Sequence, residues 1–318
     1  MNHFAISPRF TDLSIEDDEK RHRTLSRLDD DQLDLLKVED IIPLLLDEEF
    51  AIRRQAIAAL EELNDVDAIP ALLDIIAEPD LEVAEAASAA LLEFRTRDAL
   101  DPLIAGVTHP SPAAREAAVA ALGEHRNPRA IPALRTALSD PSATVRRAAV
   151  VTLARVPHQD LHSLLIPSIY DPEPGVRRSA VSALASLRAP ETLSYLLRSL
   201  RDEDWTVRRE GAAVLAHFPY PGTVIGLRRA LRETHPEVLR EIISTLAKIR
   251  APVGPAIVPF LHHEAASVRL TAVKALGEIG DPDLRTRLVK LLNDRSPEVI
   301  EAALILLARP VEPIRKAA

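Results

Sequence analysis

The side chains in this sequence that could do metal chemistry are two histidines four residues apart. On a helix, His158 and His162 would share one face, and a pair at this spacing can hold a metal ion. Pro157 precedes the pair directly, and the glutamate that a zinc hydrolase places between such histidines is missing. We expect the pair to straddle a loop and to bind no metal.

Other signatures of catalysis are missing from the sequence. It contains no glycine-rich phosphate loop, no serine elbow between glycines, and no cysteine, which excludes disulfides, thiolate nucleophiles and cysteine-ligated metals. The sequence therefore predicts no catalytic residue, no metal and no cofactor. A non-enzymatic role is favoured, although an enzymatic one stays open.

An internal repeat determines the elements that would carry any site. A motif of the type Val-Arg-Arg recurs nine times at intervals of 31 residues, with one interval of 30. With its first residue numbered zero, position +8 is always leucine and position +4 is small in all copies but one. These positions share one helical face, so they predict the buried stripe of a helix, called helix B. The zero positions are Ile52, Val83, Ala114, Val145, Val176, Val207, Val238, Val268 and Val299.

A shorter apolar segment, called helix A, precedes each helix B. Some of its prolines fall in the first turn, where a missing N–H costs nothing, namely Pro70, Pro102, Pro132 and Pro255. Others fall one turn later and should kink the helix, namely Pro43, Pro167 and Pro259. We expect glycine and Asp-Pro pairs, as in Gly280-Asp-Pro, to end each helix B.

The repeat resembles the HEAT-like repeat of the phycobilisome (PBS) lyase type. The resemblance runs from about residue 39 to 309, and one of the best copies reads Asp140-Pro-Ser-Ala-Thr-Val-Arg-Arg. It implies an all-α fold, an α/α superhelical solenoid of about nine helical hairpins. It also implies a ladder of ion pairs in the A–B turns, interrupted at Ala84, Leu239 and Ile300. The expected pairs are Asp47/Arg53, Asp140/Arg146, Asp171/Arg177 and Asp202/Arg208.

The ends of the chain lack the repeat. We predict that residues 1–38 form an acidic segment, partly disordered, with a short helix that caps the first repeat. Residues 39–309 are the solenoid, and residues 310–318 are a tail without a capping helix.

A binding surface is the main functional expectation. The resemblance implies that the B helices line a concave groove into which positions +2, +6 and +10 project. Position +6 is mostly small, and the flanking charges change sign along the chain, which would orient a partner of opposite pattern. The alternative interpretation is that these are solvated surface charges. The candidate residues are Glu85, Glu116, Glu124, Arg147, Arg155, Arg178, Arg209, Arg240 and Lys248.

Two aromatic residues are further candidates. Trp205, near an A–B turn, and Tyr195 are interpreted as a partner hot spot, with core packing as the alternative.

Two functions follow. The leading hypothesis is a scaffold or adaptor that binds an unidentified protein partner, giving a hetero-oligomer. The alternative is a phycobilin lyase or a chaperone for a chromophore or another cofactor. In a lyase, Arg147, Arg178 and Arg209 would hold bilin propionates, and Trp205 and Tyr195 would pack on the rings. Deoxyhypusine hydroxylases, which resemble this architecture, need several His-Glu pairs, whereas this sequence offers only His263-Glu264.

Composition limits the remaining classes. The net charge of −9 argues against nucleic acid as a partner. No stretch approaches the roughly 18 apolar residues that cross a bilayer, and the N-terminus has no signal-like apolar core. We therefore expect a soluble cytoplasmic protein.

Overall fold

The fold of this protein is built from helices alone. The computed structural model describes residues 37–308, and every regular element in that range is an α-helix or a short 3₁₀ helix. The described residues form two compact units that meet, in sequence, between Leu164 and Leu165. The all-α prediction is confirmed. The predicted acidic N-terminal segment, except Lys37 and Val38, and the predicted C-terminal tail lie outside the described residues.

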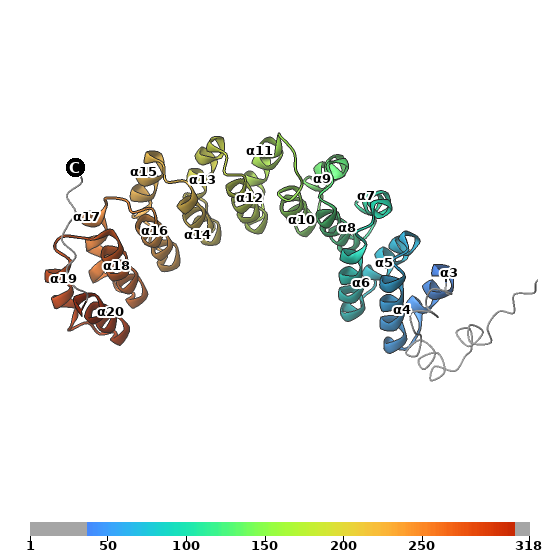
Figure 1. Cartoon of the computed structure of the whole chain (residues 1–318), viewed down its shortest axis with the longest axis horizontal. Helices are drawn as coiled ribbons and strands as arrows, with labels where there is room; N and C mark the ends of the chain where they lie inside the picture. The colour runs from blue at the N-terminus through green and yellow to red at the C-terminus, as the bar shows by residue number, and fades with distance from the viewer. Residues whose placement is uncertain (1–36, 309–318) are drawn as a thin grey trace, which may run out of the picture. The chain divides into compact units, whose positions relative to one another are not determined.

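The first unit contains four helical hairpins (Figure 1). Its B helices contact one another in succession: α4 (Phe50–Leu63), α6 (Leu81–Glu93), α8 (Pro112–His125) and α10 (Ala143–Leu153). Its A helices form a second layer: α3 (Val38–Ile41) with η2 (Ile42–Leu46), α5 (Ile69–Ile76), α7 (Leu100–Gly106) and α9 (Ile131–Ala137). Three 3₁₀ turns lead into these A helices: η3 (Val66–Ala68), η4 (Arg97–Ala99) and η5 (Pro128–Ala130). Helix α11 (Leu161–Leu165) spans the unit boundary in sequence.

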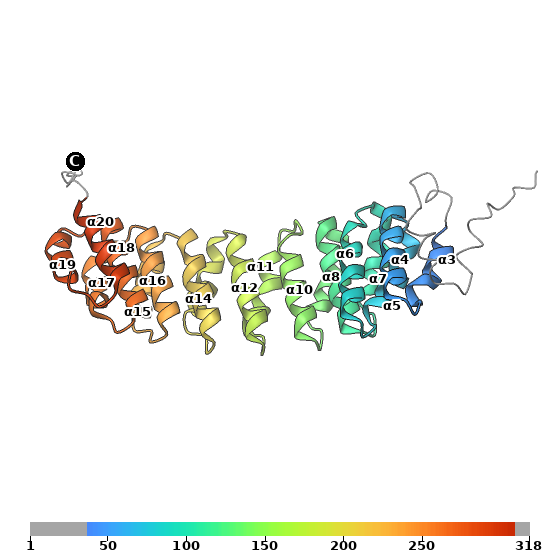
Figure 2. The same ribbon diagram turned by 90° about the horizontal axis from the view of Figure 1, so that it is seen from below.

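The second unit repeats this two-layer arrangement (Figure 2). Its B helices are α12 (Pro174–Ser186), α14 (Trp205–Val214), α16 (Pro236–Lys248), α18 (Ala266–Ile279) and α20 (Pro297–Ala308). Its A segments are η6 (Ile166–Tyr170), α13 (Leu193–Ser199), α15 (Pro221–Ala230), α17 (Gly254–Ile257) with η9 (Val258–His262), and α19 (Leu284–Leu291). The turns η7 (Pro190–Thr192) and η8 (Leu215–His217) lie between helices B and A.

The core consists of the helical stripe that the repeat predicted. The +8 leucines of the first eight repeats are completely buried: Leu60, Leu91, Leu122, Leu153, Leu184, Leu215, Leu246 and Leu276. The ninth, Leu307, is only half-buried, because no further described helix packs against α20. Each buried leucine contributes about 1.5–3 kcal/mol. Neighbouring repeats therefore supply the wall that a single hairpin lacks.

Prolines decide which kind of helix A forms. Pro70 and Pro132 fall at the first turns of α5 and α9, which remain α-helical. The late prolines behave differently, because a proline inside a helix removes a hydrogen bond and crowds the preceding turn. At each of them the chain changes from α to 3₁₀ geometry, in η2, η6 and η9, at Pro43, Pro167 and Pro259. The expected kink is thus a change of helix type.

The ends of the B helices differ from the prediction. Among the B helices whose ends lie within residues 37–308, only α18 ends on a left-handed glycine, Gly280. At the equivalent position of four other repeats the left-handed residue is Asn or Arg: Asn64, Arg126, Arg188 and Arg250. The repeats between them place a buried residue one position earlier, namely Phe94, Val156 and Phe218. The two kinds of ending therefore alternate along the chain until Gly280.

A ladder of arginines ties the A–B turns together. In α12, the guanidinium of Arg177 donates to the backbone carbonyl oxygens of Asp171 and Pro172, each at 2.9 Å. The same guanidinium makes a two-pronged pair with the carboxylate of Asp202 in the next turn, at 2.9 and 2.8 Å. The equivalent pairs are Arg53–Asp80, Arg115–Asp140, Arg208–Glu233 and Arg269–Asp294.

The ladder is therefore present, but Arg53, Arg177 and Arg208 bind carboxylates other than the expected ones. For Asp47/Arg53, Asp140/Arg146, Asp171/Arg177 and Asp202/Arg208, the arginine donates to the backbone carbonyl of the acid. The carboxylates that bind Arg53, Arg115, Arg177, Arg208 and Arg269 belong to the following repeat, 25 residues after the arginine or 27 in the case of Arg53. The guanidinium fork has enough donors to bind both groups at once. One arginine thus fixes its own turn and the next one.

Candidate functional site

The exposed side chains of the B helices form a shallow cavity in the second unit. Helices α14, α16 and α18 surround a volume of about 370 Å³. Arg209 and Arg240 lie there at position +2, Ser244 and Lys274 at +6, and Glu278 at +10. The positions predicted to project together from the B helices are therefore adjacent in this part of the fold.

The cavity carries charges of both signs. Three basic side chains, Arg209, Arg240 and Lys274, alternate with three acids, Glu237, Glu241 and Glu278. Arg240 pairs with Glu237 at 2.8 Å, and Lys248 pairs with Glu241 at 3.5 Å. Water reaches the side chains of both pairs, so each pair is weak and its members can exchange partners at little cost in free energy.

In the first unit, predicted acidic and basic residues neutralise each other. Arg147 Nη2 lies 3.4 Å from Glu116 Oε1, and Arg155 Nη1 lies 2.8 Å from Glu124 Oε1. Each pair joins equivalent positions of adjacent repeats, although Arg155 lies in the turn just after α10. Glu85 is exposed on α6 and has no ion-pair partner among residues 37–308. The basic and acidic side chains that were predicted to form oppositely charged ends of the groove therefore neutralise each other at these two pairs.

Arg178 and Arg209 differ from these pairs. Arg178 is exposed on α12 and forms no ion pair with any carboxylate in the described range. The guanidinium of Arg209 lies 5.9 Å from the ring centre of Trp205. Trp205 in turn stacks on the ring of His235, with centroids 4.4 Å apart and planes 8° from parallel.

The two aromatic candidates occupy different places. Trp205 is the first residue of α14 and remains 36% exposed. Tyr195 lies on α13, in the layer of A helices, and lines a separate cavity of about 870 Å³ together with Tyr170 and Arg198. The structure therefore does not gather Trp205 and Tyr195 into one site.

The histidines have local partners. The backbone N–H of Asp160 donates to His158 Nδ1 at 3.1 Å, and His162 Nε2 lies 3.2 Å from the hydroxyl of Ser163. Across residues 37–308, no three side chains of the metal-binding types are grouped closely enough to hold a metal ion.

A group of arginines on the A helices of the second unit, and in the turns that follow these helices, was not predicted from the sequence. They occur as Arg198 and Arg201 in one repeat and as Arg228, Arg229 and Arg232 in the next. Arg198 and Arg229 occupy equivalent positions 31 residues apart, and so do Arg201 and Arg232. This spacing of 31 residues is the sequence signal that marks them.

Comparison with known families identifies the repeat. The model described as HEAT repeats matches residues 71–151, 131–216, 198–257 and 254–313, which together exceed half of the chain. The chain belongs to the HEAT-repeat family. Within this HEAT-repeat protein, residues 52–78 also match the PBS lyase HEAT-like repeat, as the sequence predicted. No curated protein matches the chain.

Solved structures share the fold of this HEAT-repeat protein at low sequence identity. Kap95p in complex with RanGDP is 16% identical with a TM-score of 0.64, over 94% of this chain and 48% of that one. Kap95 in complex with Nup1 is 14% identical with a TM-score of 0.64, over 94% and 50% of the two chains. Importin β is 15% identical with a TM-score of 0.60, over 94% and 49%. The HEAT-repeat protein spans about half the length of these chains.

The helices of residues 37–308 are short or carry many charged side chains. None of them combines the length and the apolar character that a bilayer-crossing segment requires.

Proposed function

We propose that this HEAT-repeat protein is an interaction scaffold that holds a protein partner against the B-helix surface of its second unit. The observation that carries the proposal is the cavity between α14, α16 and α18, where exposed charges of both signs surround the small polar side chains of Ser244 and Thr271. Such a surface offers many weak contacts to a partner with a complementary charge pattern. Kap95p, which shares the fold, is a protein that binds RanGDP and Nup1.

The test is affinity capture with a charge-reversed surface. The double variant Arg209→Glu/Arg240→Glu should lose partners that the wild-type protein retains from an extract of its source cells, because two attractive contacts become repulsive. Bound proteins are quantified by mass spectrometry, and circular dichroism checks that helicity is unchanged.

A matched control separates the surface from net charge. The variant Arg135→Glu/Arg285→Glu changes the net charge equally but alters exposed arginines of the A helices α9 and α19. It should retain the partners. If both variants retain the same proteins as the wild type, the B-helix surface is not the binding site.

The lyase hypothesis has one observation in its favour, the match of residues 52–78 to the PBS lyase HEAT-like repeat. A lyase should shift the visible absorption band of an added phycobilin. The shift should disappear in Arg178→Ala and Trp205→Ala, whose side chains are exposed. An unchanged spectrum with the wild-type protein would contradict this alternative.

A further inference from the structure

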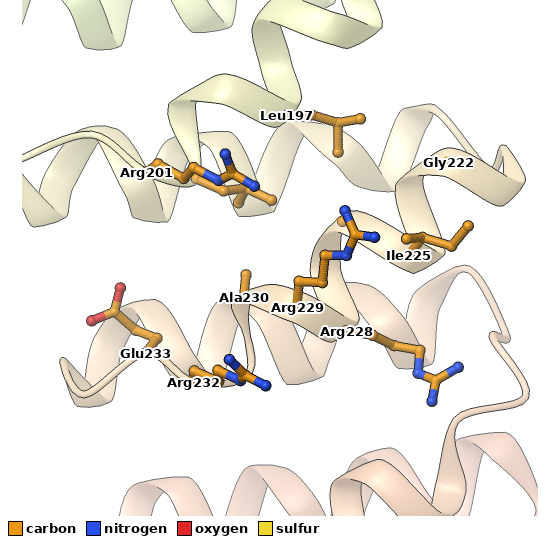
Figure 3. A pocket seen from close by; sticks show the side chains of 11 residues that line it. Leu197, Arg201, Gly222, Ile225, Arg228, Arg229, Ala230, Arg232 and Glu233 are labelled. Atoms are coloured by element: carbon orange, nitrogen blue, oxygen red, sulfur yellow. The ribbon is translucent and has the colours of Figure 1, made fainter.

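A strongly basic cleft lies between two A helices of the second unit. Helices α13 and α15 border a cavity of about 850 Å³, distinct from the B-helix cavity (Figure 3). Four arginines line it: Arg201, Arg228, Arg229 and Arg232. In Figure 3, Arg229 extends from α15 into the space below Leu197, with Arg228 and Arg232 on either side of it.

These arginines are not neutralised by the described part of the protein. All four are exposed, and none forms an ion pair with a carboxylate in residues 37–308. Among the described residues, Glu233 is the one acid that lines the cleft, and it is already bound to the ladder residue Arg208 at 2.6 Å. The cleft therefore has a local excess of positive charge, although the whole chain has a net charge of −9.

Equivalent positions of adjacent repeats carry different combinations of charge in the two units. On the B helices of the first unit, equivalent positions of adjacent repeats carry opposite charges, as in Glu116 and Arg147. In the turns that follow the A helices α13 and α15 of the second unit, the equivalent positions carry like charges, with Arg201 one repeat before Arg232. Like charges in adjacent turns repel each other, and an anion between them would relieve that repulsion.

The cleft also offers apolar surface. Ile225 of α15 is 51% exposed, and Leu197 of α13 lies opposite it. Leu197 packs directly on Gly226, where a Cβ would overlap its methyl group Cδ2. The cleft can therefore bind a ligand that has both kinds of group. Ile225 would contact an apolar side chain, and the four arginines would bind carboxylates.

We propose that the cleft between α13 and α15 binds an acidic peptide segment of a partner protein, with carboxylates on the arginines and one apolar side chain on Ile225 and Leu197. The planar guanidinium binds carboxylates through two parallel hydrogen bonds. The adjoining cavity shares Leu197 and Arg201 with the cleft and extends to Tyr170. An extended segment can therefore continue across α13.

A peptide fits this site better than a nucleic acid does. A nucleic acid would extend past the cleft over a chain whose net charge is −9, and the screening length of about 8 Å at physiological salt does not remove that repulsion at close range. It would also leave Ile225 without an apolar partner. A short peptide confines its negative charge to the cleft.

The test measures fluorescence anisotropy of a short labelled peptide that alternates Glu with Leu, added to the full-length protein. Wild-type protein should bind it, and Arg229→Glu should weaken binding about tenfold or more, equivalent to about 1.4 kcal/mol. Arg135→Glu, an exposed arginine of α9, changes the net charge equally and should leave the affinity within about twofold of the wild type.

A second pair of probes tests the apolar contact. Ile225→Ser should weaken the Glu–Leu peptide about fivefold, since a half-exposed isoleucine loses part of its apolar contact. A peptide that alternates Glu with Ser should bind the wild-type protein more weakly than the Glu–Leu peptide does. Ile225→Ser should leave the affinity for this Glu–Ser peptide unchanged. Circular dichroism of each variant verifies the fold.

Three results would overturn the proposal. The first is no binding of the Glu–Leu peptide by the wild-type protein. The second is an equal effect of Arg229→Glu and Arg135→Glu, which would indicate diffuse attraction. The third is tighter binding of a single-stranded oligonucleotide at the same arginines, which would assign the cleft to nucleic acid. The proposal concerns the A helices, so its failure leaves the proposed B-helix function untouched.

Discussion

Small side chains at the crossing of helices A and B set how closely the two helices approach. In the second unit, the crossing pairs Ser199, the last residue of α13, with Gly211 of α14, where a Cβ would overlap the Ser199 hydroxyl. In the first unit the order of sizes is reversed: Gly106 of α7 meets Ala118 of α8, and a Cβ on Gly106 would lie 3.0 Å from that of Ala118. At both of these crossings one of the two residues is glycine, and a Cβ there would overlap or crowd its partner.

This size rule predicts a compensating pair of substitutions. Gly211→Ala should lower the free energy of unfolding by about 1–3 kcal/mol, the usual cost of overpacking. Adding Ser199→Gly recreates the Gly106–Ala118 arrangement and should recover most of the loss. Urea denaturation of the two single variants and the double variant measures the coupling. Additive effects would mean that the two residues do not compete for the same space.

At the scale of the element, the ladder arginines connect successive A–B turns. The side chain of Arg177 is 7% exposed and that of Asp202 13%, so solvent screens this pair little. The adjacent Arg178 is exposed and lacks an ion-pair partner in the described range. Two neighbouring arginines of one helix thus have entirely different roles.

This contrast gives a matched pair of variants. Arg177→Ala should lower the free energy of unfolding by about 3–5 kcal/mol, because it leaves the Asp202 carboxylate and two turn carbonyls without their donor. Arg178→Ala should change it by less than about 0.5 kcal/mol. Equal effects in denaturant titrations would show that the ladder does not stabilise the turns.

The ladder also predicts a dependence on pH. Hydrogen bonds from Arg269 lower the pKa of Asp294 in the folded protein, although burial acts in the opposite direction. An unfolded chain has an ordinary aspartate pKa of about 3.9. The pair therefore stabilises the fold fully above that pH, and the stabilisation is lost as the pH falls below it.

The check compares wild type with Asp294→Asn in urea at pH 6 and near pH 3. The wild type should be more stable at pH 6, and the difference should shrink at the lower pH as Asp294 takes up its proton. A difference that stays constant would contradict the role of the ionised carboxylate.

At the scale of the whole molecule, each repeat is stabilised by its neighbours. Leu184 of α12 is fully buried against the neighbouring helices. Leu307 of α20, the last described helix, is only half-buried. Leu184→Ala should lower the free energy of unfolding by about 2–5 kcal/mol, and Leu307→Ala by less than half of that. Thermal and urea unfolding of both variants test this. A smaller loss for Leu184 than for Leu307 would contradict the shared-wall description.

The sequence predicted the features that follow from periodicity. The leucine interval specified which face of helix B is buried, and the late prolines marked where helix A changes type. The partners of the ladder arginines could not be predicted, because spacing does not tell whether a long side chain turns toward its own turn or the next. The charged residues were misjudged for a related reason. Whether Arg147 or Arg229 is neutralised depends on the charges that the adjacent repeat places beside it. These neighbours are known only from the packed structure.

The alternating helix endings carry a consequence for how the gene can change. Asn64, Arg126, Arg188 and Arg250 are 62 residues apart, so gaining or losing a block of two repeats keeps the alternation, whereas a block of one would disturb it. It is disturbed at one place, where Gly280 follows Arg250 after only 30 residues. The fold therefore tolerates two left-handed endings in succession at this point of the described array.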